Sequence, residues 1–300
     1  MINKRLILGI PHKDFHFSKI DIEDFRKYFS EVIPHYHLDD PTFSMIKKTD
    51  IIFVYQRFVQ YANVECAAKF GILYPGFGFH PFILREQMEG IAEVLDCYDA
   101  VVMNEGPIWE CYKGKENCFV VPPCASHRMF KKTRIRDKFE RIIQVANSRE
   151  PQYKGRLISE AAMKLMPYSW ELIPENDNLI GNIPWENLPL LYQAADGFLS
   201  PNQIGSSPGY YIDGKYTTAT MEAGLSGCIV FWHDCMKIGN TFETIFEISS
   251  DPKEIAKTVL DVVNSINLEK HSLLTSQEFY EKCNSEASTK AKFDIMKNFC

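Results

Sequence analysis

The 300 residues, 45% of them hydrophobic and 24% charged, are enough for two domains that each bury their own core. The formal net charge of -6 excludes a bulk attraction to nucleic acid or anionic membranes, so such a partner would need a local patch. The nine cysteines are scattered, without Cys-x-x-Cys or zinc-like spacing, which predicts reduced thiols in a cytoplasmic protein and no structural metal.

The first half alternates short apolar runs with amphipathic stretches, a pattern typical of a parallel sheet covered by helices. The apolar run near the N-terminus is short and lacks a small-residue cleavage site, which favours a first strand over a signal peptide. No run is long enough for a membrane span. The predicted strands are 5–10, 50–55, 71–74, 100–103 and 119–121, and the predicted helices are 22–33, 59–70, 81–95 and 107–112.

A basic run at 131–138 leads into the second half. A solvated linker face is the favoured interpretation, and a basic patch that binds an anionic acceptor is the alternative. The second half repeats the strand and helix alternation, and from 252 onward the chain is predicted to be helical. The predicted strands are 141–146, 170–173, 197–200, 229–232 and 244–248, and the predicted helices are 155–166, 185–194, 217–227 and two or more after 252.

Two cations and a carboxylate follow buried strands of the second half. Arg149 and Lys154 come after strand 141–146, and Glu222 lies in the helix that precedes strand 229–232. Positive charge after one strand suits a diphosphate, and an acceptor on a later helix suits ribose hydroxyls. The pattern therefore predicts a nucleotide-diphosphate site within 141–222.

The motifs of this stretch resemble those of the retaining glycosyltransferases of family 4. The matching segments are Arg149, Lys154-Gly155, Leu191-Tyr192-Gln193-Ala194-Ala195-Asp196, Pro201 and Glu222-Ala223-Gly224-Leu225-Ser226-Gly227. The resemblance covers about 135–265 and implies an α/β protein of the GT-B fold, with two Rossmann-like doubly wound domains facing a cleft. The expected domains are an acceptor domain at 1–132 and a nucleotide-sugar domain at 133–300, whose last helix, about 286–300, packs back on the first domain.

The resemblance also assigns catalytic candidates. Arg149 and Lys154 would stabilise the departing diphosphate, an arginine as a bidentate fork and a lysine as a point charge. His80, in the Gly-rich segment after strand 71–74, matches a histidine placed against the transferred sugar, and a loop histidine among phenylalanines is the alternative. An isolated cation pair would more often be solvated, so the position after a buried strand decides in favour of function.

Donor binding is assigned in the same way. Glu222 matches the second Glu of the Glu-x7-Glu motif, which accepts hydrogen bonds from the ribose, and the alternative is an acidic residue that favours the helix dipole. The N–H groups around Thr217, Thr218 and Ala219 would meet the diphosphate, and the threonine hydroxyls would contact it or cap the helix. The first Glu of the motif is missing, and Asp213 is its candidate replacement. Ile183 completes the donor-binding candidates.

The sequence thus predicts a hexosyltransferase that uses a nucleotide-diphosphate sugar, most simply a UDP-sugar, without a cofactor. No Asp-x-Asp occurs, which predicts a metal-independent reaction. The acceptor is open among a glycan, a small molecule, a protein and modified DNA, and no obligate protein partner is indicated. The alternatives are an inactive nucleotide-binding module of the same fold, a viral DNA-base glycosyltransferase and a nucleotide-sugar epimerase.

Overall fold

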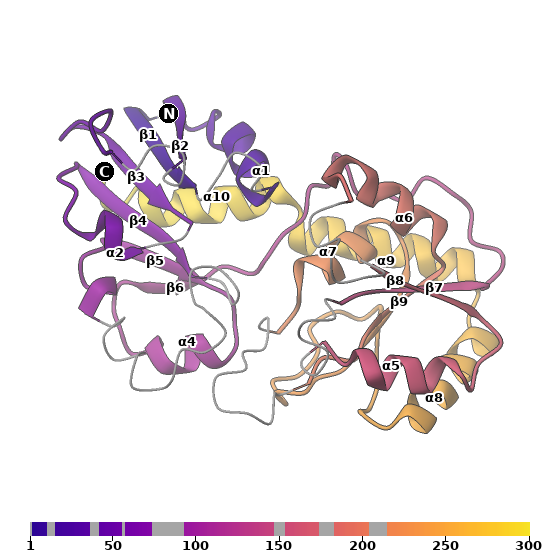
Figure 1. Cartoon of the computed structure of the whole chain (residues 1–300). Coiled ribbons are helices and arrows are strands. Elements are labelled where there is room, and N and C mark those ends of the chain that lie inside the picture. The colour runs from indigo at the N-terminus through magenta and orange to yellow at the C-terminus, as the bar shows by residue number, and fades with distance from the viewer. Residues whose placement is uncertain are drawn as a thin grey trace. The chain divides into compact units, whose positions relative to one another are not determined.

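The computed structural model describes residues 2–10, 16–36, 42–55, 58–73, 93–146, 154–173, 183–203 and 215–300. Its contacts divide the chain into two compact units (Figure 1). The first unit holds the described residues up to Pro123 together with Ser285–Cys300, and the second holds 124–203 and Lys215–Asn284. Residues 124–132 therefore group with the second unit, whereas the expected domain boundary placed them in the first domain.

The first unit is built on a six-stranded parallel sheet in the order β2-β1-β3-β4-β5-β6. Its strands are β1 (Ile2–Ile10), β2 (Phe29–Tyr36), β3 (Ile51–Val54), β4 (Ala68–Leu73), β5 (Ala100–Met103) and β6 (Cys118–Val120). β3, β4 and β5 are buried at every residue, which explains their apolar sequences; the ammonium of the one charged residue, Lys69 of β4, donates a hydrogen bond to the Ala62 backbone oxygen.

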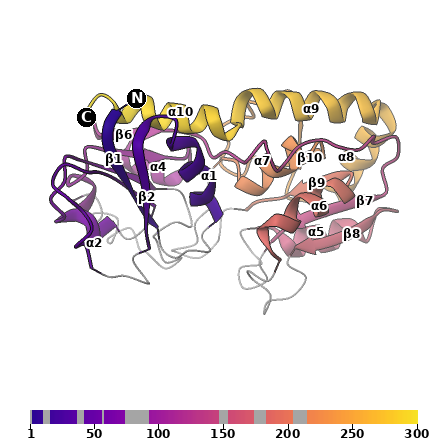
Figure 2. The same ribbon diagram turned by 90° about the horizontal axis from the view of Figure 1, so that it is seen from above.

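Helices cover both faces of this sheet (Figures 1 and 2). They are α1 (His16–Phe25) and α10 (Ser285–Met296) on one face, and α2 (Phe58–Ala62) and α4 (Pro107–Tyr112) on the other. Phe25 and Met296 belong to one apolar core, and Tyr61 and Tyr112 belong to the other. The sheet is thus sandwiched between two helix layers.

A buried ion pair fixes the last helix within the first unit. Lys292 of α10 lies 2.7 Å from the Asp21 carboxylate of α1, and both residues are 3% exposed. The Thr289 hydroxyl donates a 2.9 Å hydrogen bond to the same carboxylate, which also accepts from the Tyr55 hydroxyl. A buried charge needs such partners, and their convergence on one carboxylate specifies how α1 and α10 pack.

The second unit is built on a five-stranded parallel sheet in the order β11-β10-β9-β7-β8. Its strands are β7 (Arg141–Val145), β8 (Ser169–Ile173), β9 (Gly197–Ser200), β10 (Ile229–Trp232) and β11 (Ile245–Glu247). Its helices are α5 (Arg156–Met163), α6 (Leu188–Ala194), α7 (Thr218–Leu225), α8 (Pro252–Ser265) and α9 (Leu268–Cys283), and a 3-10 turn, Trp185–Asn187, precedes α6. α6, α7 and α9 cover one face, and α5 and α8 cover the other (Figure 1).

Two predicted helices of the first unit were wrong in extent. The predicted helix 22–33 is the end of α1 followed by β2, which pairs in parallel with β1. The predicted helix 59–70 stops at Ala62, and β4 begins at Ala68, earlier than the predicted strand 71–74. The predicted fold class itself is confirmed, because each unit is a parallel sheet covered by helices on both faces. No described helix has the length and hydropathy that a bilayer crossing requires.

Candidate functional site

The strand order of the second sheet reverses between β7 and β9. From β7 the chain passes through α5 to β8 on one side, and then returns through α6 to β9 on the other side. α5 and α7, which follow β7 and β9, lie on opposite faces of the sheet and begin at its carboxyl edge (Figure 1). In open parallel sheets, ligands bind at the carboxyl edge where such a reversal occurs. This edge is therefore the candidate site.

The two residues just before α5, Lys154 and Gly155, are held against the end of β9. Gly155 precedes α5 with φ of +66°, a left-handed conformation that favours glycine. A Cβ at this position would overlap the carbonyl oxygen of Pro201, which follows β9. The Gln144 side-chain amide donates a 2.8 Å hydrogen bond to the Lys154 carbonyl oxygen. The backbone of half-buried Lys154 is thus fixed at the carboxyl ends of β7 and β9.

The N-terminus of α7 presents open backbone donors. Thr217 caps the helix, because its Oγ1 atom accepts a 3.1 Å hydrogen bond from the Thr220 N–H and lies 2.9 Å from the Thr220 hydroxyl. The N–H groups of Thr218 and Ala219 donate to no described residue, and both residues are half-buried. Open N–H groups at a helix N-terminus attract anions.

Glu222 lies one turn further along α7 and is 8% exposed. Its Oε2 atom accepts a 2.8 Å hydrogen bond from the Tyr192 hydroxyl of α6. Burial raises the pKa of the Glu222 carboxyl to about 8, although the Tyr192 hydrogen bond acts in the opposite direction. Among the described residues, none donates to the second oxygen, Oε1. That oxygen keeps its acceptor capacity for a ligand.

Compared with the wild type, the Glu222→Gln variant is expected to become more stable as the pH rises. The folded protein holds the Glu222 proton up to about pH 8, whereas an unfolded chain releases it near pH 4.5. The stability from this group is therefore complete below pH 4.5 and is lost as the pH rises through 8. Glutamine keeps an acceptor for Tyr192 and cannot ionise. Melting temperatures of both proteins from pH 5 to 9 measure the effect, and a difference that stays constant over this range would contradict it.

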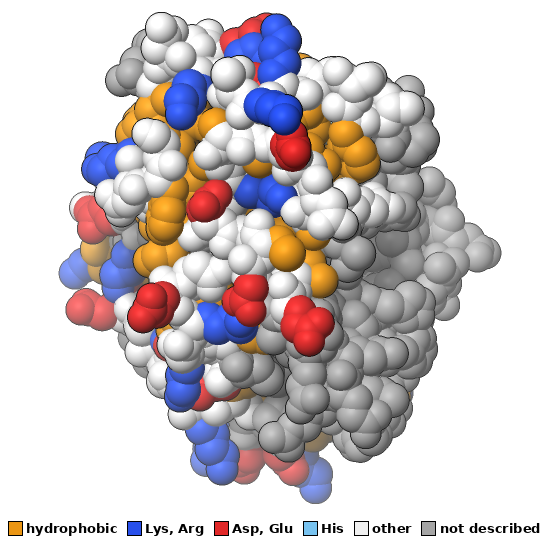
Figure 3. All heavy atoms as spheres, turned by 90° about the vertical axis from the view of Figure 1, so that its left-hand side faces the viewer, with side chains coloured by type: hydrophobic (Ala, Val, Ile, Leu, Met, Phe, Trp, Pro, Cys, Tyr) orange, Lys and Arg blue, Asp and Glu red, His pale blue; other side chains and the backbone are white. Residues whose placement is uncertain are grey.

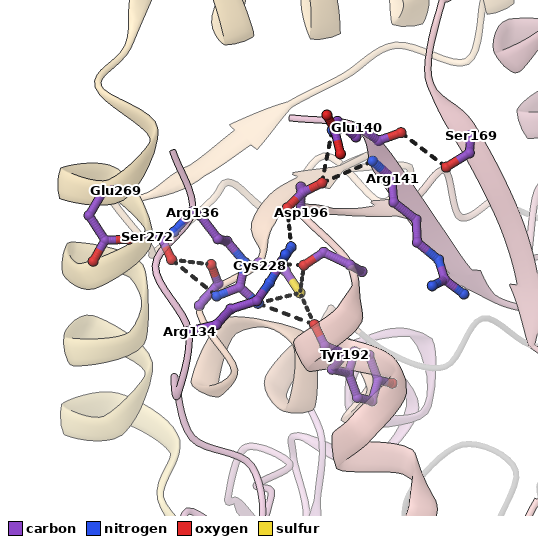
Figure 4. Close-up of polar contacts among 12 residues, drawn as sticks. Arg134, Arg136, Glu140, Arg141, Ser169, Tyr192, Asp196, Cys228, Glu269 and Ser272 are labelled. Carbon is purple, nitrogen blue, oxygen red and sulfur yellow. Dashed lines mark hydrogen bonds and ion pairs between the residues drawn. The ribbon is translucent and has the colours of Figure 1, made fainter. Parts of the chain in front are cut away.

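Figure 4 shows a polar cluster at the amino edge of the same sheet. Asp196, which precedes β9, accepts hydrogen bonds of 2.8 and 2.9 Å from the backbone N–H groups of Glu140 and Arg141 and forms an ion pair with Arg134. Arg136 is 1% exposed, and its guanidinium donates to the backbone oxygens of Ala195 at 3.1 Å and Tyr192 at 3.2 Å. This cluster ties the start of β7 to the end of α6.

The basic run 131–138 is neither a plain solvated linker nor an open basic patch. Lys132 pairs with Glu269 at 2.7 Å, Arg134 pairs with Asp196, and Arg136 is buried. Both interpretations of the run were therefore wrong for these three side chains, because all three form long-range contacts within the second unit.

Figure 3 shows a face of the first unit. Basic and acidic side chains are interspersed among the described residues on this face, and neither sign dominates.

The remaining predicted site residues are distributed as follows. Arg149, His80 and Asp213 lie outside the described residues. Ile183 is half-buried and packs against the apolar core that α6, α7 and α9 form with the sheet. Within the described part of the chain, no three His, Cys, Asp or Glu side chains form a group that could hold a metal ion.

Sequence reasoning did not find Tyr192 or Gln144 as neighbours of the candidate residues. Tyr192 stood in a quoted motif, Leu191-Tyr192-Gln193-Ala194-Ala195-Asp196, but the spacing of 30 residues to Glu222 carries no signal that their side chains meet. Gln144 is a polar residue within an apolar strand run, and 1% of it is exposed. A buried polar residue must find a partner, and a polar residue inside an apolar strand run is the signal that could have marked Gln144.

No protein-family model matches the chain, and no curated protein matches its sequence. Solved structures share its fold over nearly the whole length. HepE of Anabaena, solved in complex with UDP, is 12% identical with a TM-score of 0.68, and the alignment covers 98% of this chain and 100% of HepE. A glycosyltransferase from Rickettsia africae is 11% identical with a TM-score of 0.65, and the alignment covers 100% of this chain and 99% of that one.

A third solved structure shares the fold. AviGT4, a glycosyltransferase involved in avilamycin A biosynthesis, is 10% identical with a TM-score of 0.62, and the alignment covers 99% of this chain and 98% of AviGT4. HepE has also been solved with UDP and glucose. At these identities the comparisons establish the fold, which is the two-domain, Rossmann-like GT-B architecture expected from the sequence.

Proposed function

We propose that this chain is a glycosyltransferase that moves a hexose from a nucleotide-diphosphate sugar to an acceptor. The observation that carries the proposal is the carboxyl edge of the second sheet. The strand order reverses there between β7 and β9, and the segments that follow these two strands carry the candidate groups. These groups are Lys154, the open N–H groups of Thr218 and Ala219, and the Oε1 atom of Glu222. The fold shared with HepE, which binds UDP, and with two glycosyltransferases supports it.

In this proposal each group has a separate task. Lys154 and the α7 N-terminus bind the diphosphate, and Arg149 adds a bidentate cation. As the bond between the anomeric carbon and the diphosphate oxygen breaks, negative charge grows on that oxygen, and fixed donors stabilise it without moving. The acceptor oxygen bonds to the anomeric carbon, and its proton passes to the departing phosphate oxygen. Glu222 accepts a hydrogen bond from a ribose hydroxyl.

Two finer features of the proposal rest on the resemblance to family 4: retention at the anomeric carbon through attack on the same face, and a UDP-hexose as the donor. The expected lack of a metal requirement rests on the absence of Asp-x-Asp, and the expected cytoplasmic location rests on the scattered cysteines. Asp213 takes the place of the missing first Glu, and His80 lies against the transferred sugar. The acceptor is a glycan, a small molecule, a protein or modified DNA.

The test is calorimetric binding of UDP-, GDP- and ADP-sugars in the presence of EDTA, followed by detection of slow release of the free nucleotide. We expect one nucleotide sugar to bind and to be hydrolysed without added metal. Binding without sugar release under any acceptor mixture would instead identify an inactive nucleotide-binding module. No binding of any nucleotide sugar or free nucleotide would overturn the proposed function.

Thr218→Pro is expected to weaken UDP binding about tenfold without lowering the melting temperature. Proline fits the first helical position, and Thr217 before it is already extended (φ -91°, ψ 159°), so the substitution removes one N–H and leaves the fold intact. Thr218→Ala, which keeps the N–H, is the matched control. Calorimetry with UDP and with uridine measures both variants, and an equal loss for uridine would show that the N–H does not contact the diphosphate.

A further inference from the structure

Tyr192 is held in the second unit by contacts to its ring and by hydrogen bonds to its backbone oxygen. It is fully buried on α6, and its ring contacts Phe130 and Phe198 with centroid distances of 5.7 and 6.2 Å. Its backbone oxygen accepts hydrogen bonds from the Arg136 guanidinium at 3.2 Å and from the Cys228 thiol at 3.3 Å (Figure 4). The position of its ring is therefore set by the amino-edge cluster and by the aromatic core together.

The Tyr192 hydroxyl is directed at Glu222. It donates a 2.8 Å hydrogen bond to Oε2, and no other described residue donates to that carboxylate. A carboxylate whose one oxygen is fixed has little freedom to rotate, so the direction of its other oxygen is fixed as well. Tyr192 thus determines where Oε1 lies.

We propose that Tyr192 is the positioning residue that aims Glu222 at the ribose of the nucleotide. The inference rests on the proposed function, in which Glu222 accepts from a ribose hydroxyl, and it adds the specificity element that holds that acceptor in place. Tyr192 itself does not touch the ligand. The amino-edge cluster, through the backbone of α6, supports ribose recognition at the opposite edge of the sheet.

The geometry distinguishes this role from simple satisfaction of a buried acid. Near neutral pH the Glu222 carboxyl holds its proton, and because Tyr192 donates to Oε2, this proton lies on Oε1. Oε1 can then donate to a ligand as well as accept from it, whereas a purely structural pair would bind Oε1 to protein groups. Here the Tyr192 hydroxyl is the one described donor to Glu222, and the residue is 8% exposed. In this proposal, the two neighbouring ribose hydroxyls supply the hydrogen bonds to Oε1 that no described residue supplies.

The experiment compares UDP with 2′,3′-dideoxyuridine diphosphate, which lacks both ribose hydroxyls, in the wild type and in Tyr192→Phe. We expect the wild type to bind UDP about tenfold more tightly than the dideoxy compound. In Tyr192→Phe this preference falls to about twofold or less, through weaker UDP binding alone, while the affinity for the dideoxy compound is unchanged. A merely structural role would weaken both ligands equally.

Two variants complete the design. Tyr98→Phe, which removes another buried tyrosine hydroxyl just before β5 of the first unit, is expected to leave both affinities unchanged. Glu222→Ala removes the acceptor that Tyr192 positions, so Tyr192→Phe is also made in that background, where it should have no further effect on UDP binding. A further tenfold loss there overturns the inference.

The outcomes separate the inference from the function on which it rests. If the wild type binds neither compound, the proposed nucleotide site is wrong. If it binds both with equal affinity, or if Tyr192→Phe leaves the preference for UDP intact, the nucleotide site stands and the positioning role of Tyr192 is wrong.

Discussion

Replacing Arg136 with methionine is expected to lower the free energy of unfolding of the second unit by about 3–5 kcal/mol. The guanidinium is 1% exposed and serves the backbone oxygens of Ala195 and Tyr192 and the hydroxyl of Ser272. Methionine fills much of the same volume but donates nothing, so at least one backbone oxygen, that of Tyr192 or Ala195, loses a strong donor within the core. Denaturation followed by tryptophan fluorescence measures the loss, since Trp170, Trp185 and Trp232 belong to the second unit.

The matched control for Arg136→Met is Arg156→Met. Arg156 pairs with Glu160 one turn along α5 at 3.0 Å, and its side chain is 23% exposed. Pairs of this kind contribute about 0.3–0.5 kcal/mol, so this variant should unfold almost like the wild type. If both variants lost the same free energy of unfolding, Arg136 in the amino-edge cluster would contribute no more to stability than an ion pair on a helix surface.

The strands of the second unit were largely predictable because each contains a run of two or more consecutive apolar residues. The predicted ranges 141–146, 197–200 and 229–232 differ from β7, β9 and β10 by at most one residue. A strand covered by helices on both faces needs such a sequence, and flanking Asp, Gly and Pro residues mark its ends. The pattern therefore determines the strands wherever both faces are buried.

The edge strand of the first unit was not predictable in the same way. β2 does not show the alternating burial of a half-buried strand, and the apolar residues Ile22, Phe25, Phe29, Val32 and Ile33 also fit the helical period. Pairing with β1, which is distant in sequence, decides for a strand, and no local propensity contains this information. The predicted helix 22–33 failed for that reason.

For the candidate site, spacing identified residues but not their partners. The order of Lys154-Gly155, Pro201 and Glu222 followed from strand ends and helix starts, which are local features of the sequence. The contact of Gly155 with Pro201, the hydrogen bond from Tyr192 to Glu222 and the burial of Arg136 arise from packing between distant segments. Such contacts follow from the tertiary fold, so they could be found only in the structure.

Lys154→Ala is expected to lower the rate of nucleotide release from the donor sugar about 10²–10³-fold, with a smaller effect on donor affinity. The charge that Lys154 offers matters most when the diphosphate oxygen becomes negative, so its removal affects the transition state more than the bound substrate. Alanine keeps the backbone oxygen to which Gln144 donates, which leaves the turn before α5 in place. Initial rates of UDP release from UDP-glucose, with water as acceptor, measure kcat and KM separately.

The control for this experiment is Lys164→Ala, which removes an exposed lysine at the other end of α5. Both variants change the net charge by one, so a difference between them reports the position of the charge and not its amount. Lys154→Arg keeps a cation on a longer, planar group, and we expect it to recover part of the rate. If Lys154→Ala changed KM alone and left kcat at the wild-type value, the lysine would serve ground-state binding, and stabilisation of the leaving group would have to come from Arg149 and the N-terminus of α7.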